Sequence, residues 1–318
     1  VNHRHRNIIL GKIDKNGQPD LADLANIVKN HHIDFIAYGG SSFPNIPPSK
    51  AIHDIVRQGQ NKNAKIYFDA SHPSFIYVNN VLQHAQKSGL QFTKTECDNI
   101  KNISNYVNLL LISTDKIFGG YKGAVLLCND PNDMIAVNEK IFPGIMGGIP
   151  FPPIFANKEL FKNISLNNSK FGQEFLQYTT NILRATQFLS TRFKENGVKL
   201  LFDGTKNHLL LIELPKYLDS AKVADIIEQN TNILVTAMQG YNDSEILRLG
   251  VAPLISRHIT QKQYYNKFAD IISEQISLIS QYVKKTGNYP PNIGQALLAK
   301  DQEIYADYLT KTKEHKAA

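Results

Sequence analysis

Three short apolar runs that alternate with helical patterns constrain the fold of the first half of this chain. The runs predict strands over residues 34–38, 65–68 and 107–112. Apolar residues at helical spacing predict helices over residues 21–30, with Asp20 as N-cap, 49–58 and 76–88. Strand, helix and strand in this order are typical of parallel βαβ units, whose ligand crevice lies at the carboxyl ends of the strands.

A polar cluster follows each predicted strand. The clusters are Gly40-Ser41-Ser42, Asp69-Ala70-Ser71-His72 and Ser113-Thr114-Asp115-Lys116. Because the carboxyl ends of parallel strands share one edge of the sheet, we expect the three clusters to converge there.

The third cluster carries a lysine in an unusual setting. Lys116 stands between the end of a buried apolar run and the glycine-rich loop Gly119-Gly120-Tyr121-Lys122-Gly123, and a second apolar run, Val125-Leu126-Leu127, follows. A lysine amine can form a Schiff base with a carbonyl, which is the covalent anchor of pyridoxal-phosphate chemistry. A surface lysine at a strand end is the alternative.

The second half of the chain predicts a different arrangement. The Pro/Gly-rich segment 142–153 predicts a shaped loop, and a long helical pattern follows over 169–196. A small α/β domain is expected after it, with strands over 209–214, 233–236 and 246–249 and helices over 221–229 and 261–285. We therefore expect a cofactor-binding large domain at 1–168, a linking helix at 169–196 and a small C-terminal domain at 197–318.

Composition narrows the class of protein. Of 318 residues, 42% are hydrophobic and 20% charged, which is ordinary for a globular protein, and no apolar run approaches the length of a membrane span. The net charge of +7 is scattered, so small anionic ligands or simple solubility explain it better than nucleic acid, which is not expected as a partner. With two cysteines, no zinc-type spacing and no secretory signal, we expect a cytoplasmic protein without a metal or a membrane partner.

Six motifs stand in an order that resembles one known family. They are Ile36–Pro44, Asp69–His72, Ser113–Lys116, Phe142–Gly148, Asp203–Leu209, and Leu247–Gly250 with Pro253 and Ser256-Arg257. Together they resemble the serine hydroxymethyltransferases, pyridoxal-phosphate enzymes of fold type I, from about residue 20 to residue 279. The resemblance implies an α/β fold with a mostly parallel sheet in the large domain, a small C-terminal α/β domain, and a homodimer with its sites at the subunit interface.

The resemblance also assigns catalytic and cofactor-binding roles. Lys116 corresponds to the Schiff-base lysine, and Asp69 to the acid that pairs with the pyridine nitrogen and keeps it protonated. His72 would lie near the ring hydroxyl or near Ser41, which would contact cofactor and substrate, and Ser113 would contact the cofactor. A turn carboxylate is the alternative role for Asp69, and a structural histidine the alternative for His72.

Two further assignments come from later in the chain. Arg248 would bind the substrate carboxylate bidentately, and an internal salt bridge is its alternative. Gly147 and Gly148 would offer backbone N–H groups to the cofactor phosphate of the partner subunit, or form a plain turn.

The chain departs from the family pattern at several positions. Asp115 stands where the family has His, Lys122 where an Arg would fall and Met146 where it has Gln, and Ile149-Pro150-Phe151-Pro152 replaces Pro-His-Asn-His. The family's N-terminal region, with its phosphate loop, ring-stacking residue and folate contacts, has no counterpart. We therefore expect an incomplete or diverged chain without a tetrahydrofolate site.

These observations predict a pyridoxal-phosphate-dependent transferase or lyase. It would make or break a Cα bond of a small amino acid such as glycine, serine or threonine by an aldol or retro-aldol reaction, hydroxymethyltransferase-like or transaldolase-like. The alternatives are an aminotransferase or racemase on the same fold, and a catalytically degenerate homologue that acts as a binding protein.

Overall fold

The computed structural model describes residues 7–39, 45–78, 80–148, 150–166, 169–240 and 243–290. The chain divides into two units, Val1–Arg184 with Thr205–His208, and Ala185–Gly204 with Leu209–Ala318. The long helix α8 (Lys170–Glu195) contributes residues to both units. The assignment of three domains remains a prediction.

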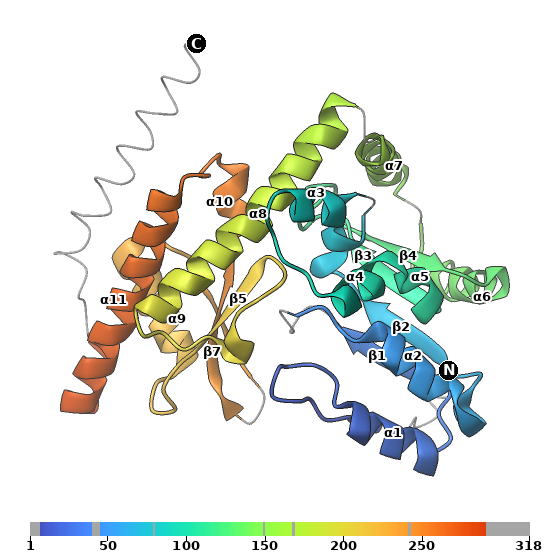
Figure 1. Cartoon of the computed structure of the whole chain (residues 1–318), viewed down its shortest axis with the longest axis horizontal. Coiled ribbons are helices and arrows are strands. Elements are labelled where there is room, and N and C mark those ends of the chain that lie inside the picture. The colour runs from blue at the N-terminus through green and yellow to red at the C-terminus, as the bar shows by residue number, and fades with distance from the viewer. Residues whose placement is uncertain are drawn as a thin grey trace. The chain divides into compact units, whose positions relative to one another are not determined.

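A four-stranded sheet organises the first unit (Figure 1). Strands β1 (Phe35–Gly39), β2 (Lys65–Asp69) and β3 (Leu109–Ser113) are parallel, and β4 (Ala124–Cys128) is antiparallel to β3, in the order β1-β2-β3-β4. The α/β fold with a mostly parallel sheet is thus confirmed, and the apolar run at 125–127 forms the antiparallel edge strand. In β2 the alternate residues Ile66 and Phe68 are fully buried, because successive side chains of a strand point to opposite faces.

Short helices connect and follow these strands. They are α1 (Leu21–Asn30), α2 (Ser49–Arg57), α3 (Val81–Lys87), α4 (Lys94–Lys101), α5 (Ile103–Tyr106), α6 (Pro131–Ile141) and α7 (Phe151–Ser165), with 3-10 turns η1 (Gly59–Asn61) and η2 (Pro73–Tyr77). The predicted N-cap of α1 is confirmed, since the Asp20 carboxylate accepts the backbone N–H groups of Ala22 and Asp23 at 2.9 and 3.1 Å.

One buried amide ties the connections of the first unit together. Asn61 is 1% exposed; its Oδ1 accepts the Ile33 N–H at 2.7 Å, and its Nδ2 donates to the carbonyls of Val28 and His31. These bonds join the segment between α1 and β1 to the turn before β2, which satisfies backbone groups that no helix or strand pairs.

The second unit contains a three-stranded antiparallel sheet in the order β5-β7-β6 (Figure 1). Its elements are η3 (Leu201–Asp203), β5 (Leu209–Glu213), α9 (Ser220–Thr231), β6 (Thr236–Gln239), β7 (Glu245–Gly250), α10 (Ala252–Ser256) and α11 (Lys262–Thr286). The Arg192 guanidinium of α8 binds the Asp270 carboxylate of α11 through two hydrogen bonds of 2.7 and 3.0 Å, which holds these helices together. No helix in the described part of the chain has the length and apolarity needed to cross a bilayer.

Three local predictions were wrong. The helix predicted over 76–88 is divided into η2 and α3, because Asn80 has a left-handed φ of 69°. The loop predicted over 142–153 ends earlier, since α7 begins at Phe151 and places two prolines in its first turn, where no N–H donor is needed. The strand predicted over 233–236 begins only at Thr236, because α9 extends to Thr231 and Asn232 closes it in the left-handed region.

Candidate active site

The acid at the end of β2 lies in the middle of the sheet edge. Asp69 pairs in register with Gly39 of β1 and with Leu111 of β3, so a strand flanks it on each side. Its Oδ1 accepts the Ser71 N–H at 2.9 Å, which turns the chain away from the sheet. The side chain is half-buried, so the carboxylate keeps access to a ligand at this edge.

Lys116 lies in the hairpin loop between β3 and β4. Ser113 and Ala124 are the last paired residues of the two strands, and the Thr114 N–H donates to the Gly123 carbonyl at 3.0 Å. The loop turns back through hydrogen bonds from Gly120 N to the Thr114 carbonyl at 2.8 Å and from Gly119 N to the Lys116 carbonyl at 3.2 Å. Thr114, at the start of the loop, is 1% exposed, whereas Lys116 is exposed. The loop is therefore anchored in the protein interior and presents the lysine to solvent.

The residue before the lysine is a fixed anion. The Ser113 hydroxyl donates to Asp115 Oδ1 at 2.7 Å, and this hydrogen bond, with smaller contributions from the Asp115 N–H and the Lys116 and Lys122 charges, lowers the pKa of Asp115. The family's histidine at this position can donate a hydrogen bond, but an ionised carboxylate only accepts. Ser113, predicted as a cofactor contact, donates its hydroxyl hydrogen bond to Asp115 in this structure.

Two motifs far apart in the chain meet at a pair of imidazoles. His72 Nδ1 lies 3.2 Å from His208 Nε2, and the rings are stacked with centroids 5.2 Å apart. Phe75 contacts the His208 ring edge-on at 6.0 Å, and His208 is 5% exposed. One nitrogen of the close pair must donate and the other accept, so the tautomers of the two rings are coupled.

The remaining predicted residues lie elsewhere. Ser41 lies outside the described residues. Gly147 and Gly148 follow α6 and are exposed, and a Cβ built on either would meet nothing within 4 Å. Arg248 is on β7 of the second unit, in register with Leu211 and Thr236.

The surroundings of Arg248 on β7 bear on its alternative role in an internal salt bridge. It is half-buried between Leu247, which is fully buried, and Leu249, which is 2% exposed. No ion pair joins Arg248 to a described acidic residue of its unit, where the ion pairs between described residues involve Arg192, Lys194 and Lys199. Nor does the described part of the chain contain a cluster of three side chains suited to a metal ion.

Two residues near the candidate site carried no role in the sequence interpretation. His208 belongs to the recognised Asp203–Leu209 motif, so the motif signalled the segment but not its contact with His72. Asn157 of α7 bonds to the backbone of the Lys116 loop, and nothing in the sequence signals that contact. A hollow of about 340 Å³ lies between this loop and α7.

Comparison with known proteins identifies the family. The serine hydroxymethyltransferase profile matches residues 7–272. The chain belongs to this family. The serine hydroxymethyltransferase of Mycoplasmopsis synoviae (strain 53) is 27% identical over 273 residues, which cover 84% of this chain and 58% of that protein. That of Francisella tularensis subsp. novicida (strain U112) is 25% identical over 270 residues, covering 82% of this chain and 58% of the relative.

This membership confirms the family prediction, together with the class of fold type I pyridoxal-phosphate transferases to which the family belongs. The chain spans about 58% of the length of these two relatives.

Proposed function

We propose that this chain binds pyridoxal phosphate through Lys116 and makes or breaks a Cα bond of a small amino acid by aldol or retro-aldol chemistry. The observation that carries the proposal is the placement of Asp69 and the Lys116 loop beyond the carboxyl ends of neighbouring parallel strands. A half-buried carboxylate and an exposed amine at one sheet edge are the two groups that would pair with the ring nitrogen of this cofactor and bind its aldehyde. Bound there, pyridoxal phosphate supplies an electron sink for negative charge at Cα.

In this proposal the residues of the first unit hold the cofactor. Lys116 would hold the cofactor covalently through its side-chain amine. Asp69 would accept a hydrogen bond from the pyridine nitrogen and keep it protonated, and its bond to the Ser71 N–H would orient the carboxylate for that role. His72, held against His208, would contact the ring hydroxyl.

Arg248 would bind the carboxylate of the amino acid. A half-buried guanidinium on a strand, without an ion pair among the described residues of its unit, is suited to a carboxylate that arrives as a ligand. Its planar fork would fix the substrate through two parallel hydrogen bonds.

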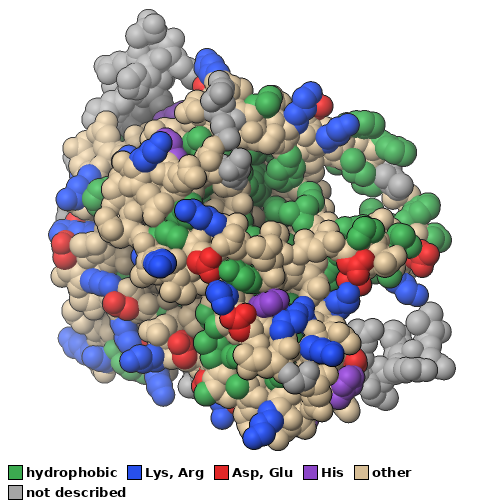
Figure 2. Space-filling view, turned by 45° about the vertical axis from the view of Figure 1, so that its right-hand side comes forward, with side chains coloured by type: hydrophobic (Ala, Val, Ile, Leu, Met, Phe, Trp, Pro, Cys, Tyr) green, Lys and Arg blue, Asp and Glu red, His purple; other side chains and the backbone are tan. Residues whose placement is uncertain are grey.

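A homodimer is part of the proposal. Figure 2 shows apolar side chains gathered on one part of the surface. Exposed apolar residues of the first unit are concentrated between α6 and the start of α7: Ile141, Phe142, Ile145, Met146, Phe151, Ile154 and Phe155. A second copy would cover this surface and bring Gly147 and Gly148 to the phosphate of its partner's cofactor.

The departures from the family favour a folate-independent aldolase or transaldolase. Asp115 is an anion beside Lys116 where the family has a hydrogen-bond donor, so the proton transfers around the lysine would differ. Glycine with an aldehyde acceptor is therefore the first substrate pair to test, with and without tetrahydrofolate. A keto-acid acceptor would distinguish an aminotransferase.

The test is covalent attachment of the cofactor. We expect the full chain to gain a visible absorbance band with pyridoxal phosphate and, after borohydride reduction, a mass increase on the peptide that contains Lys116. Lys116→Ala should lose both, and the exposed Lys158→Ala of α7 should retain both. If the full chain gives no band, and Lys116→Ala behaves like the unsubstituted chain, the proposal fails and a binding protein becomes the better interpretation.

A further inference from the structure

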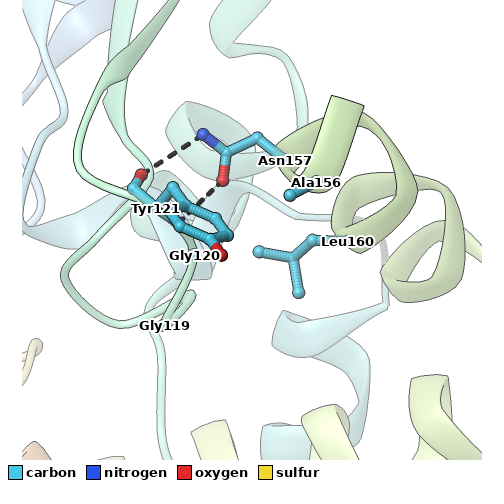
Figure 3. A pocket seen from close by; sticks show the side chains of 6 residues that line it. All are labelled: Gly119, Gly120, Tyr121, Ala156, Asn157 and Leu160. Carbon is cyan, nitrogen blue, oxygen red and sulfur yellow. Dashed lines mark hydrogen bonds between the residues drawn. The ribbon is translucent and has the colours of Figure 1, made fainter. Parts of the chain in front are cut away.

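The loop that carries Lys116 is bound from outside its hairpin by one side chain of α7. Asn157 Oδ1 accepts the Tyr121 N–H at 3.0 Å, and Asn157 Nδ2 donates to the Tyr121 carbonyl at 3.2 Å. Figure 3 shows the carboxamide facing Tyr121, with Ala156 and Leu160 of the same helix beside it. One side chain thus satisfies both backbone groups of a loop residue, as a neighbouring strand would.

The contact between Asn157 and Tyr121 lies where the loop closes on itself. Thr114, at the base of the loop, donates its hydroxyl to the same Tyr121 carbonyl that Asn157 Nδ2 contacts. The segment from Thr114 to Tyr121, which includes Lys116, is therefore tied at both ends. Tyr121 itself is 61% exposed, so its side chain does not bury the loop, and polar contacts hold this end.

The surrounding packing fixes the distance between α7 and the loop. A Cβ on Gly120 would come within 2.5 Å of Asn157 Oδ1 and 2.8 Å of Leu160 Cδ2, so only glycine allows this approach. Closer to the lysine in the same loop, the buried Phe118 packs on Phe161 of α7, with ring centroids 5.0 Å apart. Helix α7 therefore contacts the loop at Phe118 and again at Gly120 and Tyr121, and Lys116 precedes both contacts.

We propose that Asn157 is a positioning residue that fixes the loop of Lys116 and thereby sets the geometry from which its amine reacts. This inference rests on the proposed function of Lys116. A loop fixed before the ligand arrives loses less conformational freedom when the covalent bond forms. Asn157 should therefore affect the attachment step at Lys116 and leave noncovalent binding of the cofactor unchanged.

The experiment compares the two steps with pyridoxal 5'-phosphate as the probe. In the full chain, Asn157→Ala should slow the appearance of the absorbance band about tenfold, the change expected when hydrogen bonds of ordinary strength are lost. In Asn157→Asp the band should also appear more slowly than in the unsubstituted chain, by up to the same factor as in Asn157→Ala, because a carboxylate accepts the Tyr121 N–H but cannot donate to its carbonyl. Asn163→Ala is the matched control on the same helix, since the exposed side chain of Asn163 donates to the Glu159 carbonyl of its own turn.

A second background separates positioning from folding. In Lys116→Ala the cofactor can bind only noncovalently, and there Asn157→Ala should change its dissociation constant by less than about twofold. Unchanged attachment kinetics in Asn157→Ala would overturn the inference. So would a loss of noncovalent affinity in the Lys116→Ala background that is as large as the slowing of attachment. Failure of the proposed function looks different, because Lys116→Ala alone would then leave the spectrum unchanged.

Discussion

The close approach of α7 to the lysine loop gives a prediction that can be worked from the coordinates. Gly120→Ala would place a methyl group 2.5 Å from Asn157 Oδ1, 2.8 Å from Leu160 Cδ2 and 2.9 Å from the Thr114 carbonyl oxygen. Ordinary contacts of a carbon atom are about 3.5–4.0 Å. The two side chains of α7 can shift, but the Thr114 carbonyl is part of the hairpin base and cannot move without disturbing the pairing of β3 with β4.

Overpacking of this kind costs about 1–3 kcal/mol. For a unit of this size we expect the thermal unfolding midpoint to fall by about 2–12 °C. Circular dichroism on the full chain measures the shift, and uptake of pyridoxal phosphate should slow in parallel because the loop of Lys116 moves with Gly120.

Two neighbouring glycines provide controls. Gly123→Ala should be nearly neutral, since the nearest atom to its Cβ would be Thr114 Oγ1 at 3.4 Å. Gly119→Ala meets no atom within 4 Å but has a φ of 66°, so it should cost about 1–2 kcal/mol through backbone strain alone. The double variant Gly120→Ala/Asn157→Ala should lose less than the sum of its parts, because the closest clash is removed. An unchanged midpoint for Gly120→Ala, or strict additivity in the double variant, would refute the packing argument.

Three further predictions concern other parts of the molecule. Asn61→Ala should lower the free energy of unfolding by about 2–4 kcal/mol in urea titrations, because it removes the partner of the Ile33 N–H and of the Val28 carbonyl, and a loss under 1 kcal/mol would contradict that accounting. Arg192 lowers the pKa of Asp270, so their pair stabilises the fold above the ordinary carboxyl pKa of about 4 and loses that contribution as the pH falls through the lowered value. The stability difference between the native chain and Asp270→Asn should therefore shrink in thermal melts from pH 7 to pH 3, and a constant difference would refute it. His208→Ala should cost about 1–3 kcal/mol and release His72, seen as a changed histidine side-chain signal in NMR.

Local patterns in the sequence predicted most of the elements but not the contacts between them. The ten-residue helix α1 carries its own start signal in Asp20, and the strand β2 shows the alternation of a buried strand, so both could be read from short windows. The break between η2 and α3 depends on the left-handed conformation of Asn80, which many asparagines do not adopt. The antiparallel pairing of β4 depends on the hairpin that precedes it, since an apolar run alone does not encode its direction.

The candidate site shows the same division. The place of Asp69 and Lys116 at the sheet edge could be predicted because Asp69 ends one strand and Lys116 follows the next, and parallel strands bring their ends to one edge. The contact of His72 with His208 joins residues 136 positions apart, and no local period signals it. Asn157 is less predictable still, because its role comes from the approach of α7 to a glycine-rich loop and not from its own neighbours in the sequence.

The antiparallel strand also changes how the lysine is held. In a βαβ unit a strand end leads into a connection that leaves the sheet, so a residue there is fixed on one side only. Here the loop leaves the sheet at Ser113 and returns to it at Ala124, in register with where it began, so the sheet fixes both of its ends. Helix α7 then binds the returning arm through Asn157. The loop therefore becomes ordered when the first unit folds. A ligand that reacts with the amine of Lys116 meets a residue whose backbone is already fixed.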